Sequence, residues 1–308
     1  MSITTGSSSS LPSHPAGELG ARQMAERIKV NLTGVTETLL ISLLGRAVDA
    51  ASERPILGDA YATGVMEKLD YDFGKLPMPP TNAAGVALRT RFYDRWTSAF
   101  LAAHSHATVL HLACGLDSRN QRVSWGPNVR WIDVDLPEVI ALRCRVLPTS
   151  LPGQDYLLVG ADITGDAWLK DIPTDRPVLV VMEGLLSYLP PEDATAVLKR
   201  LVDVLKEGEL YFDCMNSRVL SVTRKYRKGA VNQTGSEFKW AVEDVKDIEK
   251  IHPHLQLIEV IRYFEAPGVE EFPLLGRIWC YMLSWVPSLR DSVRFVRFGF
   301  SDEQRSES

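Results

Sequence analysis

The sequence predicts an α/β fold in which a doubly wound, mostly parallel sheet carries helices on both faces. Short apolar runs rich in β-branched residues, such as VLVVM at 178–182, alternate with longer segments of helical periodicity. Buried parallel strands have this composition because both of their faces are covered. A chain that alternates strands with helices returns to the same sheet by crossovers. With 308 residues, 45% of them hydrophobic, the chain can form one large core.

The first third of the chain predicts helices that precede the sheet. Residues 1–18 are rich in Ser, Pro and Gly and predict a disordered tail, so we expect one domain over 19–308. Apolar residues then recur at helical spacing up to about residue 51, and again over 86–102. A loop rich in Asp, Gly and Pro separates them at 69–80. N-terminal helices therefore occupy about 19–104.

Five buried strands follow, and they define a core sheet over about 105–215. Helical segments separate them. Pro137 opens one helix at a first-turn position, and Pro191 opens a longer one that runs to Leu205 before Gly208 ends it. The predicted strands are 107–112 (ATVLHL), 129–134 (VRWIDV), 156–159 (YLLV), 178–182 (VLVVM) and 209–215 (ELYFDCM).

The last third of the chain predicts a lid and a closing pair of strands. The basic, polar stretch 218–235 is either a solvated surface segment or part of a lid, which we place at about 216–250. Apolar runs at 255–263 and 278–285 suit an antiparallel pair within about 251–300.

Composition excludes several classes of partner and site. A net charge of −5 and a pI near 5.8 argue against a nucleic-acid or anionic-membrane surface. No apolar run approaches the roughly 20 residues that span a bilayer, and no secretory signal is recognisable at the start. The four cysteines form no CxxC pair, so neither a metal site nor a disulfide framework is indicated. We therefore expect a cytoplasmic chain without a metal; the sequence leaves the oligomeric state open.

Small and acidic residues follow the predicted strands, where open α/β sheets bind their ligands. The first strand is followed by Ala113, Cys114 and Gly115, which let a ligand approach the backbone closely. Asp135, 20 residues beyond Gly115, follows the second strand. An acidic residue at this spacing commonly accepts hydrogen bonds from ribose hydroxyls.

Two further carboxylates, Asp162 and Glu183, follow the third and fourth strands. Three carboxylates at equivalent strand ends suit a ligand with a ribose diol, an exocyclic amine and an ammonium group, which describes S-adenosylmethionine. The G-x-G-x-x-G pattern of dinucleotide sites is broken by Ala113, and the sequence has neither a phosphate-binding G-x-x-x-x-G-K-[ST] loop nor a G-x-S-x-G elbow. Nicotinamide cofactors, nucleotide triphosphates and hydrolase chemistry are therefore disfavoured.

Five segments carry a resemblance to a known family over about residues 32–215. Segments 32–40 (LTGVTETLL) and 85–91 (GVALRTR) are similar to the tetracenomycin-type polyketide O-methyltransferase branch. Three further segments resemble successive motifs of the leucine carboxyl methyltransferase family: 111–119 (HLACGLDSR), 131–137 (WIDVDLP) and 181–189 (VMEGLLSYL). The resemblance implies a Rossmann-like methyltransferase sheet and S-adenosyl-L-methionine as cofactor.

The resemblance also implies roles for individual residues. Ala113 stands where the protein-methylating branch has glycine, and residues 34–38 lack that branch's lysine. The implied roles are Arg89 at the methionine carboxylate, Ala113, Cys114 and Gly115 in the glycine loop, Asp135 at the ribose, Asp162 and Ile163 at the adenine, Glu183 near the methionine end, and Tyr188 on the pocket wall.

Methyl transfer is an in-line displacement, so the enzyme mainly holds the reacting atoms in line. A carboxylate acceptor is already ionised at neutral pH, whereas a phenol normally needs a general base. None of the six histidines is compelling as a base, and His111 reads as a core residue. We therefore expect an O-methyltransferase that forms methyl esters on a small organic acid or an aromatic polyketide-type acceptor.

The acceptor contacts stay open at this stage. Arg119, Arg122 and Tyr188 are the candidates to position the acceptor, and Arg218 or Arg224 can supply a cation from the lid. Three alternatives remain: a phenol O-methyltransferase, a protein C-terminal carboxyl methyltransferase, and a non-catalytic regulator that binds S-adenosylmethionine.

Overall fold

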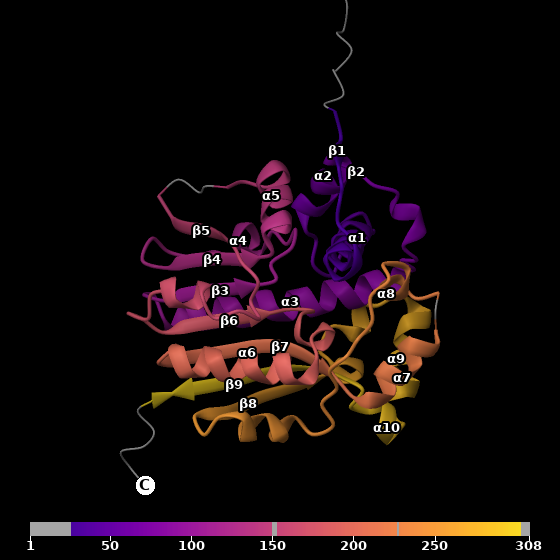
Figure 1. Cartoon of the computed structure of the whole chain (residues 1–308). Coiled ribbons are helices and arrows are strands. Elements are labelled where there is room, and N and C mark those ends of the chain that lie inside the picture. Colours follow the sequence, from indigo (N-terminus) through magenta and orange to yellow (C-terminus); the bar gives the residue numbers. More distant parts are fainter. Residues whose placement is uncertain (1–25, 150–152, 227, 303–308) are drawn as a thin grey trace, which may run out of the picture.

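A seven-stranded sheet forms the centre of the computed structural model, which describes residues 26–149, 153–226 and 228–302. The tail predicted at 1–18 lies outside the described residues. The strand order is β5-β4-β3-β6-β7-β9-β8, and β9 runs in the opposite direction to the other six strands (Figure 1). The predicted α/β class is therefore confirmed. The strands are β3 (Thr108–Leu112), β4 (Arg130–Asp135), β5 (Asp155–Gly160), β6 (Val178–Met182), β7 (Glu207–Met215), β8 (Leu255–Arg262) and β9 (Val293–Ser301).

The strand order reverses beside β3. From β3 the chain builds outward through β4 to β5, and then returns to the other side of β3 to form β6 and β7. Ligands of open α/β sheets bind at such a reversal, outside the carboxyl ends of the strands. The fold thus directs attention to the loops that follow β3, β4 and β6.

Helices cover both faces of the sheet because successive strand residues point to opposite sides. Val109 packs in the cluster that contains α3 (Pro80–Ala103), whereas Leu110 packs in the cluster that contains α6 (Pro191–Val204). In α6 the buried residues are spaced at i, i+3, i+4, i+7 and i+8, which is one face of a helix: Ala194, Val197, Leu198, Leu201 and Val202. The two crossovers predicted to start at prolines do so, with α5 (Pro137–Val146) as the other.

The N-terminal elements form a third apolar cluster together with α5. In Figure 1 they lie at the upper right, beyond the right-hand ends of β3 to β5. The segment predicted as a loop at 69–80 holds a short strand and a 3-10 turn. These elements are β1 (Ile28–Lys29), η1 (Gly34–Thr38), α1 (Leu39–Ala50), α2 (Ala60–Lys68), β2 (Leu69–Asp70) and η2 (Phe73–Lys75).

One predicted closing strand is confirmed and the other is wrong. The run at 255–263 forms β8, but the run at 278–285 lies in the helix α9 (Leu274–Ser284), and the last strand is β9. Pro273 precedes the first turn of α9, and a run of this length satisfies a helix as readily as a strand. The signal for β9 is the alternation of the buried Phe298 and Phe300 with the less buried Arg297, Gly299 and Ser301.

The remaining helices are short, and several gather beyond the carboxyl ends of the strands, at the right of Figure 1. Within the described residues, no helix has the length and apolar content needed to cross a membrane. These helices are α4 (Arg119–Arg122), η3 (Trp168–Asp171), η4 (Leu186–Tyr188), α7 (Ser217–Lys225), α8 (Ala230–Gln233), η5 (Val245–Ile251), η6 (Tyr263–Glu265), η7 (Val269–Glu271) and α10 (Pro287–Arg290).

Candidate cofactor and active site

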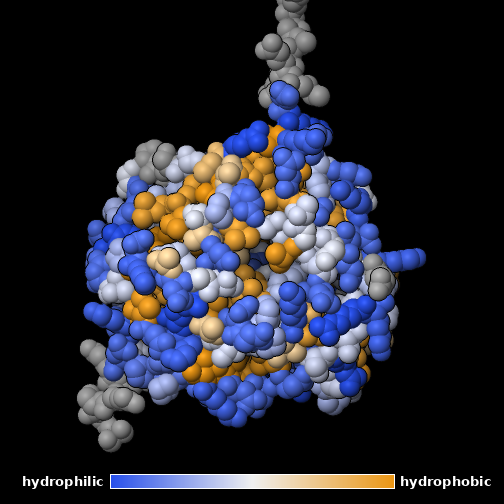
Figure 2. Space-filling view, viewed as in Figure 1, coloured by the Kyte–Doolittle hydropathy of each residue, from blue (hydrophilic) through white to orange (hydrophobic). Residues whose placement is uncertain are grey.

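A cavity of about 500 Å³ lies at the carboxyl ends of the central strands. Its walls come from the loops after β3, β4, β5 and β6, from the end of β7, and from η1, α1 and α3. Hydrophobic and polar side chains mix on the face seen in Figure 2, where a small hollow opens near the centre among hydrophobic residues. The predicted residues on the cavity wall are Arg89, Ala113, Cys114, Gly115, Asp135, Asp162, Ile163, Glu183 and Tyr188.

The loop after β3 takes an unusual backbone path. Ala113 has φ of +50° and Gly115 has φ of +51°, and Ala113 is the one non-glycine residue with positive φ in the described part of the chain. Only glycine adopts this left-handed region without a steric cost. A Cβ at Gly115 would also lie 3.2 Å from Leu39 Cβ, so the N-terminal helix α1 approaches this backbone closely.

Asp135 at the end of β4 holds that loop in place. The Gly115 N–H donates to Asp135 Oδ2 at 2.7 Å, and the Leu136 N–H donates to Oδ1 at 2.8 Å. Burial raises the pKa of Asp135, while these two backbone donors oppose the shift. Each carboxylate oxygen accepts more than one hydrogen bond, so Asp135 retains acceptor capacity on the cavity wall.

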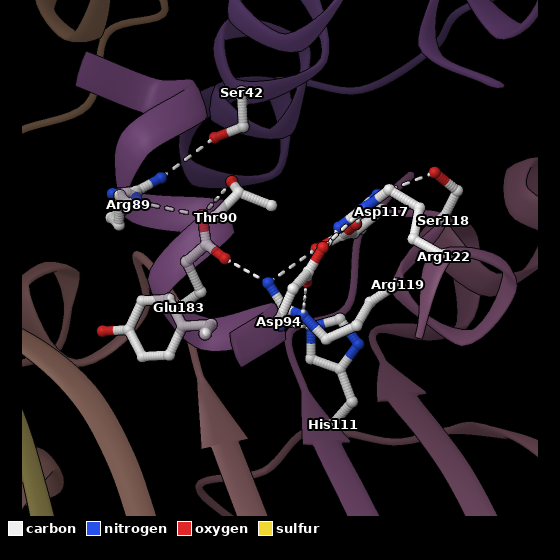
Figure 3. A network of polar contacts seen from close by, with 12 residues as sticks. Ser42, Arg89, Thr90, Asp94, His111, Asp117, Ser118, Arg119, Arg122 and Glu183 are labelled. Carbon is white, nitrogen blue, oxygen red and sulfur yellow. Dashed lines mark hydrogen bonds and ion pairs between the residues drawn. The ribbon is translucent and has the colours of Figure 1, made fainter. Parts of the chain in front are cut away.

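Arg89 of α3 and Glu183 after β6 form the charged end of the cavity. Arg89 Nε lies 3.0 Å from Glu183 Oε1, and its Nη2 donates to Ser42 Oγ at a long 3.4 Å (Figure 3). Arg89 Nη1 is 3.8 Å from the nearest oxygen of Asp213. The guanidinium is thus anchored through Nε, while its two terminal nitrogens are only loosely held. That fork suits the two oxygens of a carboxylate.

Glu183 is ionised and fixed from three sides. Besides Arg89, the Thr90 hydroxyl donates to Oε1 at 2.8 Å and Arg119 Nη2 donates to Oε2 at 2.5 Å. Burial alone would raise the pKa of Glu183, but Arg89 and Arg119 together lower it. A buried carboxylate with this many donors is held in one orientation.

Arg119 and Arg122 lie behind the cavity rather than on its wall. Arg119 is fully buried, and both arginines bind the carboxylates of Asp94 and Asp117 (Figure 3). A buried guanidinium requires such partners, because desolvation would otherwise cost several kcal/mol. The structure therefore does not bring either arginine to the acceptor, where the sequence had placed them as candidates. Arg119 acts on the site through Glu183.

His111 has partners at both ring nitrogens, as predicted for a core histidine. Its Nδ1 lies 3.3 Å from Asp133 Oδ1, and its Nε2 lies 3.2 Å from Arg119 Nη1. Since arginine can only donate, Nε2 accepts and Nδ1 carries the proton. The ring reaches the cavity wall with neither nitrogen free.

Aromatic and apolar side chains line the end of the cavity nearest η4. The rings of Tyr188 and Phe238 lie 4.9 Å apart, and the Lys239 N–H donates to the Ser187 carbonyl at 2.7 Å. The segment at 238–239 therefore lies against η4. Burial raises the pKa of Tyr188 to about 12, so its hydroxyl stays protonated and can donate a hydrogen bond. Val35, Met215, Val231 and Lys239 also line the cavity.

Several residues on the cavity wall were not predicted from the sequence, Asp213, Ser42 and Lys239 among them. Asp213 accepts the Gly184 N–H at 2.6 Å, and burial raises the pKa of Asp213. A charged residue within the buried, apolar second half of β7 is a signal that could have identified it. Ser42 and Lys239 had no such signal, because only the tertiary fold carries them to the cavity.

The residues present fit S-adenosylmethionine. Acidic and basic groups meet at the Arg89 end, where Gly184 leaves space: a Cβ there would lie 3.3 Å from Arg89 Nη1. Ser187 Oγ is buried on the wall without a hydrogen-bond partner in the described structure, and a polar ligand would satisfy it. Asp162 lies past the end of β5, where its Oδ1 accepts from Thr164.

Comparison with known proteins agrees with this geometry. The family match and the curated relatives show that the chain is an S-adenosylmethionine-dependent methyltransferase, a class to which the sheet and the acidic residues at its strand ends are suited. Within that class the chain belongs to the leucine carboxyl methyltransferase family, whose sequence profile matches residues 40–202.

Two curated relatives cover most of the chain. The tetracenomycin polyketide synthesis O-methyltransferase TcmP of Streptomyces glaucescens is 38% identical over 274 residues, which is 88% of this chain and 98% of that protein. The S-adenosyl-L-methionine-dependent methyltransferase dpfgK of Gibberella zeae is 36% identical over 247 residues, covering 75% and 83%.

Solved structures support the fold alone. A Thermobifida fusca protein described as a methyltransferase superposes with a TM-score of 0.53 at 18% identity, over 84% of this chain and 94% of that one. A DUF574 family protein of Streptomyces avermitilis gives the same TM-score at 14% identity, over 85% and 97%.

Proposed function

We propose that this enzyme acts in the cytoplasm and methylates a carboxylate oxygen of a small aromatic or polyketide-type acid, forming a methyl ester. What supports this acceptor is the lining of the cavity near η4, where the cation Lys239 accompanies the aromatic rings of Tyr188 and Phe238. Aromatic walls suit a planar acceptor, and an ammonium pairs with its carboxylate. The relative TcmP is named for polyketide O-methylation.

The cofactor's placement is part of the proposal. Arg89 would bind the methionine carboxylate, and Glu183 would lie near the ammonium group. Asp135 would accept the ribose hydroxyls, while Asp162 and Ile163 would hold the adenine. The loop at 113–115, which lines the cavity with short side chains, would allow the cofactor to approach its backbone closely.

When bound, S-adenosylmethionine would supply a methyl group on a positively charged sulfur, so that the acceptor oxygen forms a bond to the methyl carbon while the sulfur leaves as a neutral thioether. The chain's own residues bind, orient and exclude water, and these contributions lower the barrier without a covalent step on the enzyme. Both nitrogens of His111 are occupied, so this ring does not take a proton from the acceptor. A carboxylate needs no such base, because it is ionised at neutral pH.

The decisive test offers matched acceptors to the purified enzyme. Aromatic acids are compared with phenols that have the same rings but no carboxyl group, and products are detected by mass spectrometry. We expect a product that alkali hydrolyses back to the acid, as a methyl ester does and a methyl ether does not. The rate should vary little above pH 5 with an acid, since its carboxylate is already ionised.

Three outcomes would count against the ester. An alkali-stable ether, with a rate that rises toward the phenol's pKa near 10, would indicate phenol methylation. A product formed only on peptide C-termini would indicate a protein substrate. Cofactor binding without any methylated product across the panel would favour a regulatory binder.

As a residue-level check, Lys239→Met should raise KM for acids while leaving cofactor affinity unchanged.

A further inference from the structure

Helix α9 exposes an unusual amount of apolar surface. Eight large hydrophobic side chains at 274–286 are between 41% and 73% exposed, and three of them are aromatic. Soluble proteins scatter such residues singly over their surfaces, so a contiguous set has a cause. The eight residues are Leu274, Leu275, Ile278, Trp279, Tyr281, Met282, Trp285 and Val286.

The exposed residues follow two parallel stripes. Positions 274, 278, 281 and 285 form one stripe, and positions 275, 279, 282 and 286 form the other. Within α9 both step by four and then three residues, which is the spacing of a helix seam that packs against another helix. Trp285, the C-cap of α9, continues the first stripe by a further step of four, and Val286 follows it in extended backbone before α10. Arg277 is the one charged residue of α9.

The opposite face of α9 is already packed. Gly276 and Cys280 are buried, and a Cβ at Gly276 would lie 2.8 Å from Thr81 Cγ2, so α9 rests closely on the start of α3. The helix is therefore apolar on nearly all sides. A helix of that kind normally has neighbours all around it.

The area involved matches a protein interface. With roughly 150–250 Å² for a whole aromatic side chain and less for an aliphatic one, the exposed fractions amount to on the order of 900 Å². Monomeric proteins rarely expose a contiguous apolar patch above roughly 600 Å². Each partner in a standard interface contributes about 800 Å².

We propose that α9 is the core of a homodimer interface, in which it packs antiparallel against α9 of a second copy about a twofold axis. A two-stripe seam is complementary to itself, because each stripe fills the spaces beside the other. Antiparallel pairing also aligns the two helix dipoles favourably. The groove beside α9, lined by Phe264, Val269, Ile278 and Tyr281, receives side chains from the second helix.

A second copy fits this surface better than a lipid bilayer does. Helices that lie on membranes carry Lys and Arg along their polar face, whereas α9 has only Arg277 and packs its other face on α3. The net charge of −5 also disfavours anionic lipid. The surface is separate from the cofactor cavity, so this inference stands independently of the acceptor.

Sedimentation equilibrium on the full chain tests the proposal. We expect wild type to sediment at twice the 34.3 kDa of one chain at micromolar concentration. Trp279→Glu, at the middle of the seam, should weaken self-association at least 100-fold, and Trp279→Phe should preserve it. Val222→Glu on α7, at a similarly exposed valine, should leave the dimer intact. Circular dichroism confirms that each variant is folded.

Two results would overturn the interface. One is a wild-type chain that remains a monomer at 50 µM, since this measurement needs no variant. The other is a dimer that Trp279→Glu leaves unchanged. Co-sedimentation of the wild-type chain with phosphatidylglycerol vesicles, lost in Trp279→Glu without any change in self-association, would assign the surface to a membrane instead.

Discussion

The backbone at Ala113 combines a strained conformation with a position on the cofactor cavity. Its φ of +50° costs an alanine roughly 1–2 kcal/mol, which a glycine would not incur. Glycine in turn loses more conformational entropy on folding, by about 0.5–1 kcal/mol. The relief of strain is the larger effect.

Ala113→Gly should therefore raise the free energy of unfolding by about 0.5–1 kcal/mol. Urea denaturation at pH 7 measures this difference. Cofactor affinity should be equal or higher, because loss of the Ala113 methyl group adds no atoms to the cavity and leaves more room for the cofactor. A loss of stability would show that the side chain of Ala113 makes contacts worth more than the strain.

Asp135 should contribute directly to cofactor affinity. Asp135→Ala removes a charged acceptor from the proposed ribose site and releases the Gly115 N–H, so binding should weaken by about 1–3 kcal/mol. Calorimetric titration with S-adenosylmethionine gives the change. Asp155→Ala, at the opposite end of the neighbouring strand β5, is the control and should bind normally. Unchanged affinity for Asp135→Ala would remove this residue from the site.

For individual residues, the sequence predicts which side chains lie at the ends of strands. It does not predict which side chains from distant segments contact one another. Asp135 and Glu183 were predicted because strand ends are recognisable from composition. The burial of Arg119 was not, because its partners Asp94 and Glu183 come from α3 and from the loop after β6. Pairing between distant segments leaves no local pattern in a single sequence.

The packing of α1 on α3 sets the width of the cavity. A Cβ at Gly45 would lie within 2.8–2.9 Å of three carbons of Val86, so the two helices touch where only glycine fits. Ser42, on the next turn of α1, and Arg89, on the next turn of α3, both face the cavity. Any separation of these helices therefore moves both residues.

Gly45→Ala should destabilise the chain and weaken cofactor binding. The clash costs about 1–3 kcal/mol, which exceeds the gain of about 1 kcal/mol in helix propensity. Gly64→Ala in α2 is a matched control, because its Cβ would meet nothing within 4 Å and should stabilise the chain by up to about 1 kcal/mol. Thermal unfolding without cofactor measures the change in stability of each variant, and the added shift with cofactor measures its cofactor binding. Equal behaviour of both variants would contradict the close contact.

Among the helices and strands, those whose apolar residues follow one clear spacing, either that of a strand or that of a helix, were predictable from the sequence. The strands β3, β4 and β6 and the helix α6 follow their patterns closely. The segment at 278–285 was predicted as a strand because nearly every residue in it is apolar, which erases the difference between the two periods. The same excess of apolar residues gives α9 its exposed face. The single-domain division and the lid at 216–250 stay predictions.

Across the whole molecule, buried carboxylates make folding depend on pH. Burial alone would raise the pKa of Asp133, but Arg143, His111 and Tyr156 lower it to about 2, from an ordinary 3.8. Because the folded state favours the ionised form, the stabilisation is fully present above pH 4 and is lost as the pH falls through 2. The shift corresponds to about 2 kcal/mol. Arginine partners also lower the pKa of Asp117 and Glu183, which adds in the same direction.

Tyr156→Phe tests how much of this pH-dependent stabilisation comes from Asp133. The Tyr156 hydroxyl donates to Asp133 Oδ2 at 2.7 Å and favours the ionised carboxylate, so its removal should raise the pKa of Asp133 in the folded state. The variant should be less stable than wild type by about 1 kcal/mol at pH 6, and this difference should narrow as the pH falls from about 3 through 2, where the folded-state Asp133 carboxylate gains its proton. Urea denaturation at a series of pH values measures it, with Tyr61→Phe on exposed α2 as the control. A difference that stays constant down to about pH 2, where the folded-state Asp133 gains its proton, would mean that Tyr156 stabilises the fold by packing alone.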